Sequence, residues 1–428
     1  MELEEYMERF IGLLGIFIIF LIAFLMSNNK KAINLKTVGM GFLLQILLAI
    51  FIFKVPLGEK MFLFIGEFIR KILDFAYEGG MFVFGPLLDN LRLGELFDNN
   101  STIFTLQLVC SSIFMMVLVN ILYYYGIMQV VVAVLGKAMN KVMKVSGAEA
   151  LSNVASAFVG QIVAQIMIKP YLEKLTRSEL LASMAGSMAC ISGAIMPIYI
   201  GMGIPAHYLL ASSVMAAPGA LILAKIIYPE TGEPETRDNI KISRRRTFTN
   251  VFDAISNGAG EGMKVAINVT AMILALVALV AFIDWLLGLG GLFLYKYIPG
   301  FSHLAFLNHL SLSYILGKIF MWFALILGVP FQDAAAVGSL MGTKIVLNEM
   351  VAYVNLSHIA STLQAKSFMI ASFALCSFGN FGSIAIQIGG IGELAPNQRK
   401  NLARLGLRAL ICGTLSCYLS AAIVGILM

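Results

Sequence analysis

Charged side chains are scarce in this sequence of 428 residues. Lys, Arg, Asp and Glu make up 13% of it, whereas a soluble globular domain contains about 25%. Hydrophobic residues make up 59%, and the mean hydropathy is +0.87. This composition excludes an ordinary soluble domain. It predicts an all-α polytopic membrane protein.

Motifs for catalysis and metal binding are also missing. The five cysteines occur singly in apolar stretches: Cys110, Cys190, Cys376, Cys412 and Cys417. The four histidines show no metal-ligand spacing: His207, His303, His309 and His358. The sequence has no G-x-x-x-x-G-K-[ST] or G-x-S-x-G motif. We therefore predict a protein that is not an enzyme and has no cofactor. The basic residues behind the net charge of +6 lie in short loops, so we expect no nucleic-acid partner.

About 20 apolar residues are needed to span a lipid bilayer. Eight stretches fit this length: 11–27, 38–54, 102–125, 178–201, 206–227, 264–288, 366–390 and 402–427. An even number places both termini on one side. Lys and Arg gather in the loops of the opposite side, which predicts a cytoplasmic (inner) membrane protein with both termini outside. The first span follows acidic residues and has no small-residue cleavage site, so we expect it to be retained.

Several segments do not fit a simple span. The regions 148–173 and 332–358 are apolar but interrupted by Gly, Gln, Asn or Glu. We interpret them as re-entrant hairpins, because non-helical backbone at membrane depth is tolerated only inside protein or beside a watery cavity. Residues 60–78 and 126–143 are typical either of interfacial helices or of loop helices packed on the protein. The stretch 311–330 is helical and apolar, and its pattern leaves open whether it spans.

An internal repeat relates the two halves. A shift of 189 positions aligns residues 177–195 with 366–384 at six identical positions, and sets Gly160 opposite Glu349. The first copy begins inside and the second outside, so the repeats are inverted, as in secondary transporters whose site lies near the midplane. We expect four parts: N-terminal scaffold spans and interfacial helices (1–147), a first repeat (148–228), a linker with an interfacial helix and a scaffold span (229–310), and a second repeat (311–428).

Glu349 is the most informative polar residue at membrane depth. A charged side chain there costs about 2.5–3.5 kcal/mol, so it has a partner or a functional role. An ion pair with Lys344 and a position near the aqueous rim are the alternatives to ligand binding. Asn380 lies between Gly379 and Phe381, which suits an unwound segment. An ordinary interhelical hydrogen bond is the alternative for this amide.

Long ordered stretches in both halves resemble the concentrative nucleoside transporters. They include SNNKKAINLKTVG (27–39), NVFDAISNGAGEGMKVAINVTAMI (250–273), NEMVAY (348–353), SFALCSFGNFGSIAI (372–386) and GGIGELAP (389–396). The resemblance covers almost the whole chain. It implies a homotrimer, each protomer having a scaffold and a mobile transport domain built from two hairpins and partly unwound helices. It also implies symport of a nucleoside with Na⁺ or, as in some bacterial members, H⁺.

The same resemblance implies which residues bind the ribose. Glu349, Asn380 and Ser383 would bind the sugar hydroxyls, with Phe378 packing nearby. This agrees with the chemistry of Glu349, because a carboxylate facing a diol can accept two charge-assisted hydrogen bonds.

The nucleobase side departs from the family pattern. The family has G-Q-T-E-A-P at the first hairpin tip, where this chain has G-Q-I-V-A-Q (160–165). Gln161 is retained, but Ile162 and Val163 replace the Thr and Glu. Because hydrogen-bonding sites discriminate far more strongly than apolar pockets, we expect a weaker or altered base preference, towards a larger, more apolar or modified nucleoside.

The cation site also departs from the family pattern. Resemblance implies a Na⁺ site made mainly of backbone carbonyls, at Ser156, Val159, Cys190 and Ile191. Cys190 stands where the family has a serine side chain, and a thiol suits a hard cation poorly. Two hypotheses follow: the carbonyls hold Na⁺ with Ser192 or water completing the shell, or protons drive transport through Glu349.

Three functions remain open. The favoured one is a secondary active symporter that imports nucleosides. A divergent transporter of a related ribosylated metabolite is the alternative within transport. A non-transporting membrane receptor or scaffold on the same fold is the alternative outside it.

Overall fold

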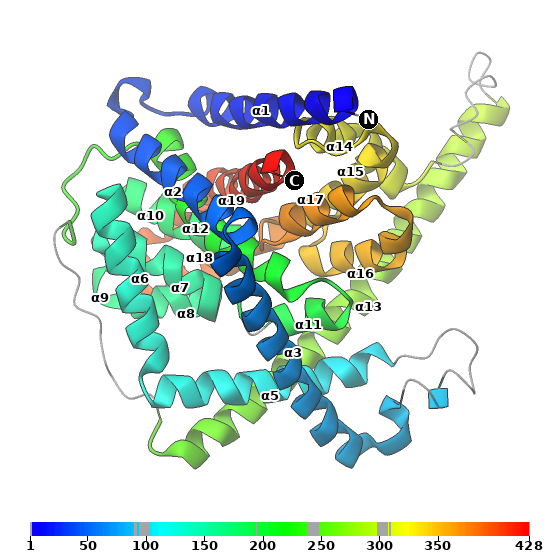
Figure 1. Cartoon of the computed structure of the whole chain (residues 1–428), viewed down its shortest axis with the longest axis horizontal. Helices are drawn as coiled ribbons and strands as arrows, with labels where there is room; N and C mark the ends of the chain where they lie inside the picture. Colours follow the sequence, from blue (N-terminus) through cyan, green and yellow to red (C-terminus); the bar gives the residue numbers. More distant parts are fainter. Residues whose placement is uncertain are drawn as a thin grey trace.

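The computed structural model describes residues 2–89, 92–93, 103–193, 195–237, 248–297, 307 and 310–427. Within these ranges every regular element is a helix, which confirms the predicted all-α fold (Figure 1). The N-terminal part contains α1 (Glu2–Leu25), η1 (Lys30–Ala32), α2 (Leu35–Lys54), α3 (Pro56–Phe84), η2 (Gly85–Leu88), α5 (Phe104–Tyr124) and α6 (Ile127–Met143). The segments 60–78 and 126–143 are therefore helical, as parts of α3 and α6.

Two units of similar construction follow, each with a helical hairpin, a broken helix and a continuous helix. The first contains α7 (Gly147–Val159), α8 (Gln161–Met167), α9 (Lys169–Leu172), α10 (Arg177–Ala189), α11 (Met196–Gly201) and α12 (Ala206–Ile227). The second contains α15 (Phe331–Val346), α16 (Glu349–Ile359), η4 (Ala360–Thr362), α17 (Ala365–Leu375), α18 (Phe381–Leu394), η5 (Pro396–Gln398) and α19 (Arg399–Leu427). Between the units lie α13 (Val251–Tyr297) and α14 (Leu312–Ile326). The predicted hairpins and repeats are confirmed.

Each hairpin turns where the sequence weakens the helix. Gly160 has φ +86° and ψ −179°, a conformation available to essentially no residue but glycine. In the second hairpin the Asn348 side chain accepts a hydrogen bond from the Val351 N–H at 3.0 Å and caps α16. Hydrogen bonding at each turn thus comes from the protein itself.

The helix breaks change how the predicted spans are built. Five helical segments in the described chain are long and apolar enough to cross a membrane: α2, α5, α12, α13 and α19 with its η5 turn. The predicted spans 178–201 and 366–390 are divided at 190–195 and 376–380, and the apolar helical part of α1 is limited to 10–25. The chain bends by 117° between α14 and α15. At about 1.5 Å per residue α14 is too short to cross alone.

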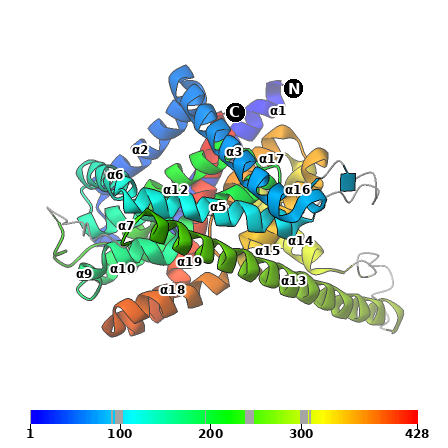
Figure 2. The same ribbon diagram turned by 90° about the horizontal axis from the view of Figure 1, so that it is seen from below.

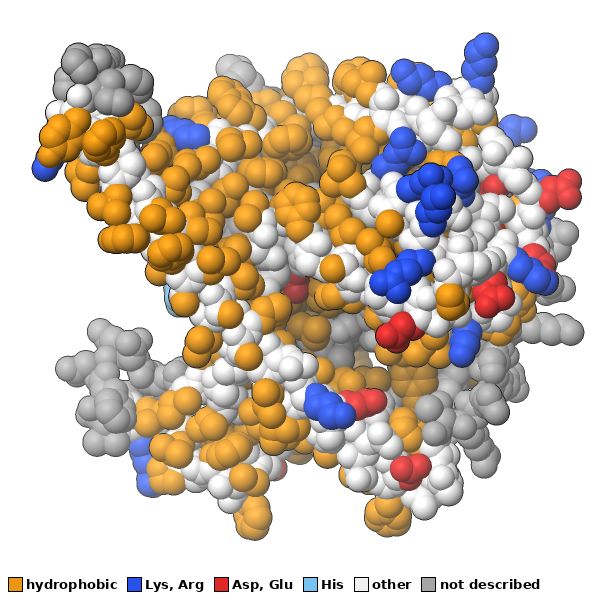
Figure 3. All heavy atoms as spheres, turned by 180° about the vertical axis from the view of Figure 1, so that it is seen from behind, with side chains coloured by type: hydrophobic (Ala, Val, Ile, Leu, Met, Phe, Trp, Pro, Cys, Tyr) orange, Lys and Arg blue, Asp and Glu red, His pale blue; other side chains and the backbone are white. Residues whose placement is uncertain are grey.

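Helices α12 and α19 form the centre of the molecule. Their most apolar windows are 89% and 83% buried, compared with 11% for α13. α13 packs on α5 through Gly258 and Gly262, where a Cβ would collide with the α5 backbone near Val117 and Ile113. Further along, Met272 of α13 contacts Asn348 and Asp284 accepts a hydrogen bond from the Leu312 N–H, and the C-terminal part of the helix extends away from the body (Figure 2). Its exposed apolar side chains belong to a broad hydrophobic surface, and most of the charged side chains in that view lie at one end (Figure 3).

The N-terminal helix α1 packs along α19. A Cβ on Gly12 would collide with the side chain of Ile426. The two ends of the chain consequently lie beside each other in both ribbon views (Figure 1 and Figure 2).

The base of the first hairpin is fixed by buried charge. Lys225 Nζ lies 2.6 Å from Glu149 Oε2 and 3.5 Å from Glu230 Oε2. The N–H of Gly147 donates to the Thr236 carbonyl at 2.8 Å. These contacts tie α7 to α12 and to the segment that follows it, so only the far end of the hairpin reaches the centre.

Candidate functional site

Helix N-termini from both units lie close together. Gln161, which begins α8, donates to Ser383 in the first turn of α18 (from Phe381), and Asn380, which caps α18, donates to Glu349, which begins α16. Helix N-termini carry partial positive charge and free N–H groups. Their convergence therefore favours a carboxylate or the oxygen atoms of a polar ligand.

Glu349 is 5% exposed and receives hydrogen bonds from two broken helices. Its Oε1 accepts from the Tyr199 hydroxyl at 3.1 Å, and its Oε2 accepts from Asn380 Nδ2 at 3.1 Å. Each carboxylate oxygen keeps a further lone pair. The acid is thus held in place by neutral donors while it can still accept hydrogen bonds from a ligand.

Asn380 has a defined orientation because it caps α18. Its Oδ1 accepts from the Ser383 N–H at 2.9 Å, which leaves Nδ2 to donate to Glu349. Asn380 therefore makes more than an ordinary interhelical hydrogen bond, which was the alternative considered from the sequence. It also caps α18 at the break between α17 and α18. Phe378 lies in the same break and is 9% exposed.

Lys344 does not pair with Glu349 among the described ion pairs. Its fully buried ammonium donates to the Ala374 carbonyl at 3.2 Å and lies 5.5 Å from the ring centroid of Tyr418. No described hydrogen bond or ion pair within 4 Å joins the two side chains, although the ammonium is close enough to interact electrostatically with the carboxylate. The low exposure of Glu349 argues against a place at the aqueous rim.

The first hairpin contributes Gln161 and Ile162 to this centre. Gln161 Nε2 donates to Ser383 Oγ at 3.2 Å, which joins α8 to α18. The side chain of Ile162 lies directly against Gly390 of α18. Val163 is 42% exposed and therefore points away from the buried residues. The roles of these residues in substrate binding stay predictions.

The first hairpin is joined to α10 by a row of polar side chains. Ser156 Oγ lies 3.0 Å from Ser187 Oγ, Gln165 Nε2 donates to Ser187 Oγ at 2.8 Å, and Ser183 Oγ donates to Gln165 Oε1 at 2.6 Å. The Gly193 N–H donates to the Phe158 carbonyl at 3.1 Å. This network holds the hairpin tip against the break after α10.

The predicted cation residues lie at that break. Ser156 uses its carbonyl to accept the Gly160 N–H at 3.1 Å. Outside the regular helices, no described backbone N–H donates to the carbonyls of Val159, Cys190 or Ile191. The Cys190 thiol points back along α10 and donates to the Gly186 carbonyl at 3.2 Å. The hard ligands offered here are carbonyl oxygens, and the thiol has another partner.

Tyr199 is a site residue that the sequence analysis missed. It is fully buried, and its ring lies 4.4 Å from that of Tyr353, centroid to centroid. The Tyr353 hydroxyl donates to the Ser372 carbonyl at 2.8 Å. A signal was available, because Tyr199 is a polar side chain two residues after Pro197 in the predicted span 178–201. Its partner, Glu349, is too distant in sequence to be identified from the pattern.

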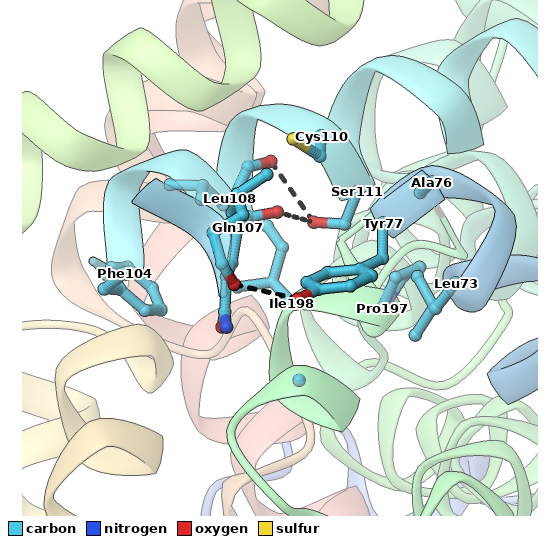
Figure 4. A pocket seen from close by; sticks show the side chains of 12 residues that line it. Leu73, Ala76, Tyr77, Phe104, Gln107, Leu108, Cys110, Ser111, Pro197 and Ile198 are labelled. Atoms are coloured by element: carbon cyan, nitrogen blue, oxygen red, sulfur yellow. Dashed lines mark hydrogen bonds between the residues drawn. The ribbon is translucent and has the colours of Figure 1, made fainter. Parts of the chain in front are cut away.

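A separate cavity of about 210 Å³ lies on the other side of α11. Its lining includes Leu73 and Tyr77 of α3, Cys110 of α5, and Pro197 and Ile198 of α11 (Figure 4). The predicted ligand residues do not line this cavity. It marks the boundary between α11 and the N-terminal helices.

Comparison with known proteins decides the family. Two halves of one family description, "Na+ dependent nucleoside transporter" N-terminus and C-terminus, match residues 14–87 and 208–425, and "Nucleoside recognition" matches residues 105–206. The chain belongs to the Na⁺-dependent nucleoside transporter family. The resemblance identified from sequence is confirmed, and the family consists of transporters, not enzymes.

Relatives of this transporter align with nearly its whole length. It is 40% identical to the uncharacterized transporter YutK of Bacillus subtilis, over 97% of this chain and 98% of that protein. It is 37% identical to the nucleoside permease NupC of Helicobacter pylori, over 97% of each. The solved structure of CNTnw in an inward-facing substrate-bound state superposes with a TM-score of 0.89 at 38% identity, over 98% of this chain and 97% of that one. The helical arrangement described above is that of the family.

Proposed function

We propose that this transporter is a symporter that imports nucleosides, with Glu349, Asn380 and Ser383 binding the ribose. One observation carries the proposal: a buried carboxylate lies between two helix breaks, and both of its described hydrogen-bond donors are neutral. Vicinal hydroxyls are donors that can use its remaining lone pairs. The sugar would pack beside Phe378, and the base would extend towards Gln161 and Ile162.

Na⁺ is the proposed coupling ion. The carbonyl oxygens of Val159, Cys190 and Ile191 are hard ligands without a described backbone donor outside the regular helices, and Ser156 can contribute its second carbonyl lone pair. Ser192 supplies a hydroxyl close to the first hairpin tip. Its Cβ lies 3.0 Å from the position that a Cβ on Gly160 would occupy. One charge moving down 100 mV releases about 2.3 kcal/mol, enough for a concentration ratio of about fifty.

The proposed setting is the cytoplasmic membrane, with both termini outside and three copies forming a homotrimer. The adjacent chain ends and the basic loops support this topology. The apolar surface of α13 supports an environment of lipid or of a second copy.

Uptake into proteoliposomes tests the function. Labelled nucleosides are offered under an inward Na⁺ gradient and, separately, under a pH gradient. We expect the Na⁺ gradient to accelerate uptake and Glu349→Gln to reduce it at least about 10-fold, because a charge-assisted hydrogen bond contributes about 1.5–3 kcal/mol. Acceleration by the pH gradient alone would identify H⁺ as the coupling ion. No acceleration of any nucleoside by either gradient would overturn nucleoside symport.

The cation site has its own test in Cys190→Ser. We expect the serine hydroxyl, a harder ligand, to lower the Na⁺ concentration that gives half-maximal uptake. Cys412→Ser is the matched control, since Cys412 is equally buried but contacts the Ala220 carbonyl instead. An unchanged Na⁺ requirement in Cys190→Ser would remove this position from the cation site.

A further inference from the structure

Gln387, on the second turn of α18, has a buried amide without a partner. The residue is fully buried, and neither its Nε2 nor its Oε1 has a hydrogen-bond partner in the described part of the chain. An amide left unpaired inside a protein is costly. Such a side chain is expected where a ligand supplies the missing bonds.

The position of Gln387 follows from its helix face. Ser383, Gln387 and Gly390 project within an arc of about 60° on α18. Ser383 accepts a hydrogen bond from Gln161 at 3.2 Å, and Gly390 lies against the side chain of Ile162. Gln387 therefore lies between the two α18 residues that contact the first turn of α8.

Gln161 has an unpartnered atom on the facing helix. Its Oε1 is buried and without a partner, although its Nε2 is bonded to Ser383. The amides of Gln161 and Gln387 thus leave one donor group and two acceptors unused between α8 and α18. This unused capacity adjoins the hydrogen bonds that link Ser383 through Asn380 to Glu349.

We propose that Gln387 is a recognition residue for the base of the transported nucleoside. Its amide presents a donor beside an acceptor, which matches a base edge with the same pair, such as the amino group and N7 of adenine. The inference rests on the proposed nucleoside transport and deepens it. It assigns part of the hydrogen bonding to the base to α18, beside the apolar Ile162.

The test compares two solutes that differ only at this edge. Adenosine carries the 6-amino group and purine riboside lacks it. Each competes with uptake of the nucleoside that the wild-type protein carries fastest, in proteoliposomes of wild type, Gln387→Leu and Gln387→Ala. We expect the wild type to favour adenosine about 3- to 10-fold, as for one neutral hydrogen bond, and both variants to lose this preference.

Thermal stability separates recognition from a structural role. Leu replaces the unpaired amide with an apolar group of similar size, so ligand-free Gln387→Leu should melt at the wild-type temperature or above it. Gln45→Leu is the matched control. Gln45 is also fully buried with an unpartnered Oε1, but it lies on α2 and donates to Ser420. We expect this control to keep the adenosine preference.

Three results would overturn the assignment: a wild type without preference between the two solutes, variants that keep the wild-type preference, or a Leu variant that melts early and weakens both solutes equally. The last result would make Gln387 structural. Failure of the proposed function is seen separately, in the wild type alone, as the absence of gradient-driven uptake of any nucleoside.

Discussion

At the scale of single residues, the central carboxylate is held by neutral groups. Tyr199 and Asn380 each donate one hydrogen bond to Glu349, whereas Lys344 donates to the Ala374 carbonyl. A direct ion pair would satisfy the carboxylate and compete with an incoming hydroxyl. In the proposed function, the two neutral donors orient the acid and leave its remaining lone pairs for the hydroxyls of the substrate. The burial of Glu349 is therefore better explained by binding than by stability.

Tyr199→Phe should weaken solute binding while the fold is kept. The substitution removes the hydroxyl that donates to Glu349 and leaves the ring against Tyr353. A hydrogen bond to a charged group contributes about 1.5–3 kcal/mol, so we expect KM for uptake to rise about 10-fold or more. Concentration-dependent uptake in proteoliposomes gives the value.

Tyr353→Phe is the matched control for this variant. It removes a hydroxyl of equal burial that donates to the Ser372 carbonyl and not to Glu349. We expect it to lower thermal stability by about 1 kcal/mol and to leave KM nearly unchanged. Equal KM values for the two variants would show that Tyr199 does not act through Glu349.

At the scale of elements, the site is made by helices that stop and restart. Asn348 and Asn380 begin α16 and α18 through the same side-chain cap. Gly160 serves α8 by a different means, because its backbone conformation excludes a side chain. Each restart directs a helix N-terminus at the centre, so the partial charges needed for an acid and a polar solute come from the backbone.

The sequence predicted these elements because their signals are local. Gly160, Asn348 and Asn380 interrupt apolar runs, and such interruptions are readable without a partner. Contacts between the two units could not be predicted from the sequence. Tyr199 meets Glu349 across 150 positions, and the unpaired amide of Gln387 depends on what α8 and α18 leave empty. Packing decides those features, and a single sequence carries no direct record of it.

Gly160→Ala should displace the first hairpin tip. The added Cβ would force a backbone conformation reserved for glycine and would approach Ser192 Cβ to 3.0 Å. Such strain costs about 1–3 kcal/mol. We expect lower thermal stability and loss of most uptake, because the tip carries Gln161 and the carbonyl of Val159.

Gly389→Ala provides the comparison. Nothing lies within 4 Å of a Cβ at this α18 position, and alanine favours the helix. This control should match or exceed wild-type stability and keep uptake. If the two alanine variants behaved alike, the conformation of Gly160 would not be what positions the tip.

At the scale of the whole molecule, the site lies in the two units, and the N-terminal helices flank them. α5 packs on α13 through the glycine contacts, while residues of α11, α3 and α5 line the cavity of Figure 4. The hollow of about 210 Å³ leaves this boundary incompletely filled by side chains, whereas a protein interior is closely packed. We propose it as the boundary along which a mobile transport domain moves past a scaffold.

A cross-link across this cavity should arrest transport. Cys110 on α5 is the only cysteine of the five that is not fully enclosed, and Ile198 on α11 lines the same cavity. In Ile198→Cys, a short bifunctional thiol reagent can join the two helices. We expect uptake to stop after cross-linking while substrate binding persists, because the site residues are untouched and only the relative movement of α5 and α11 is blocked.

Ile198→Cys combined with Cys110→Ser, treated in the same way, should keep transporting. Full uptake by protein shown by peptide mapping to be cross-linked would mean that α11 and α5 move together, and that the moving boundary lies elsewhere in the molecule.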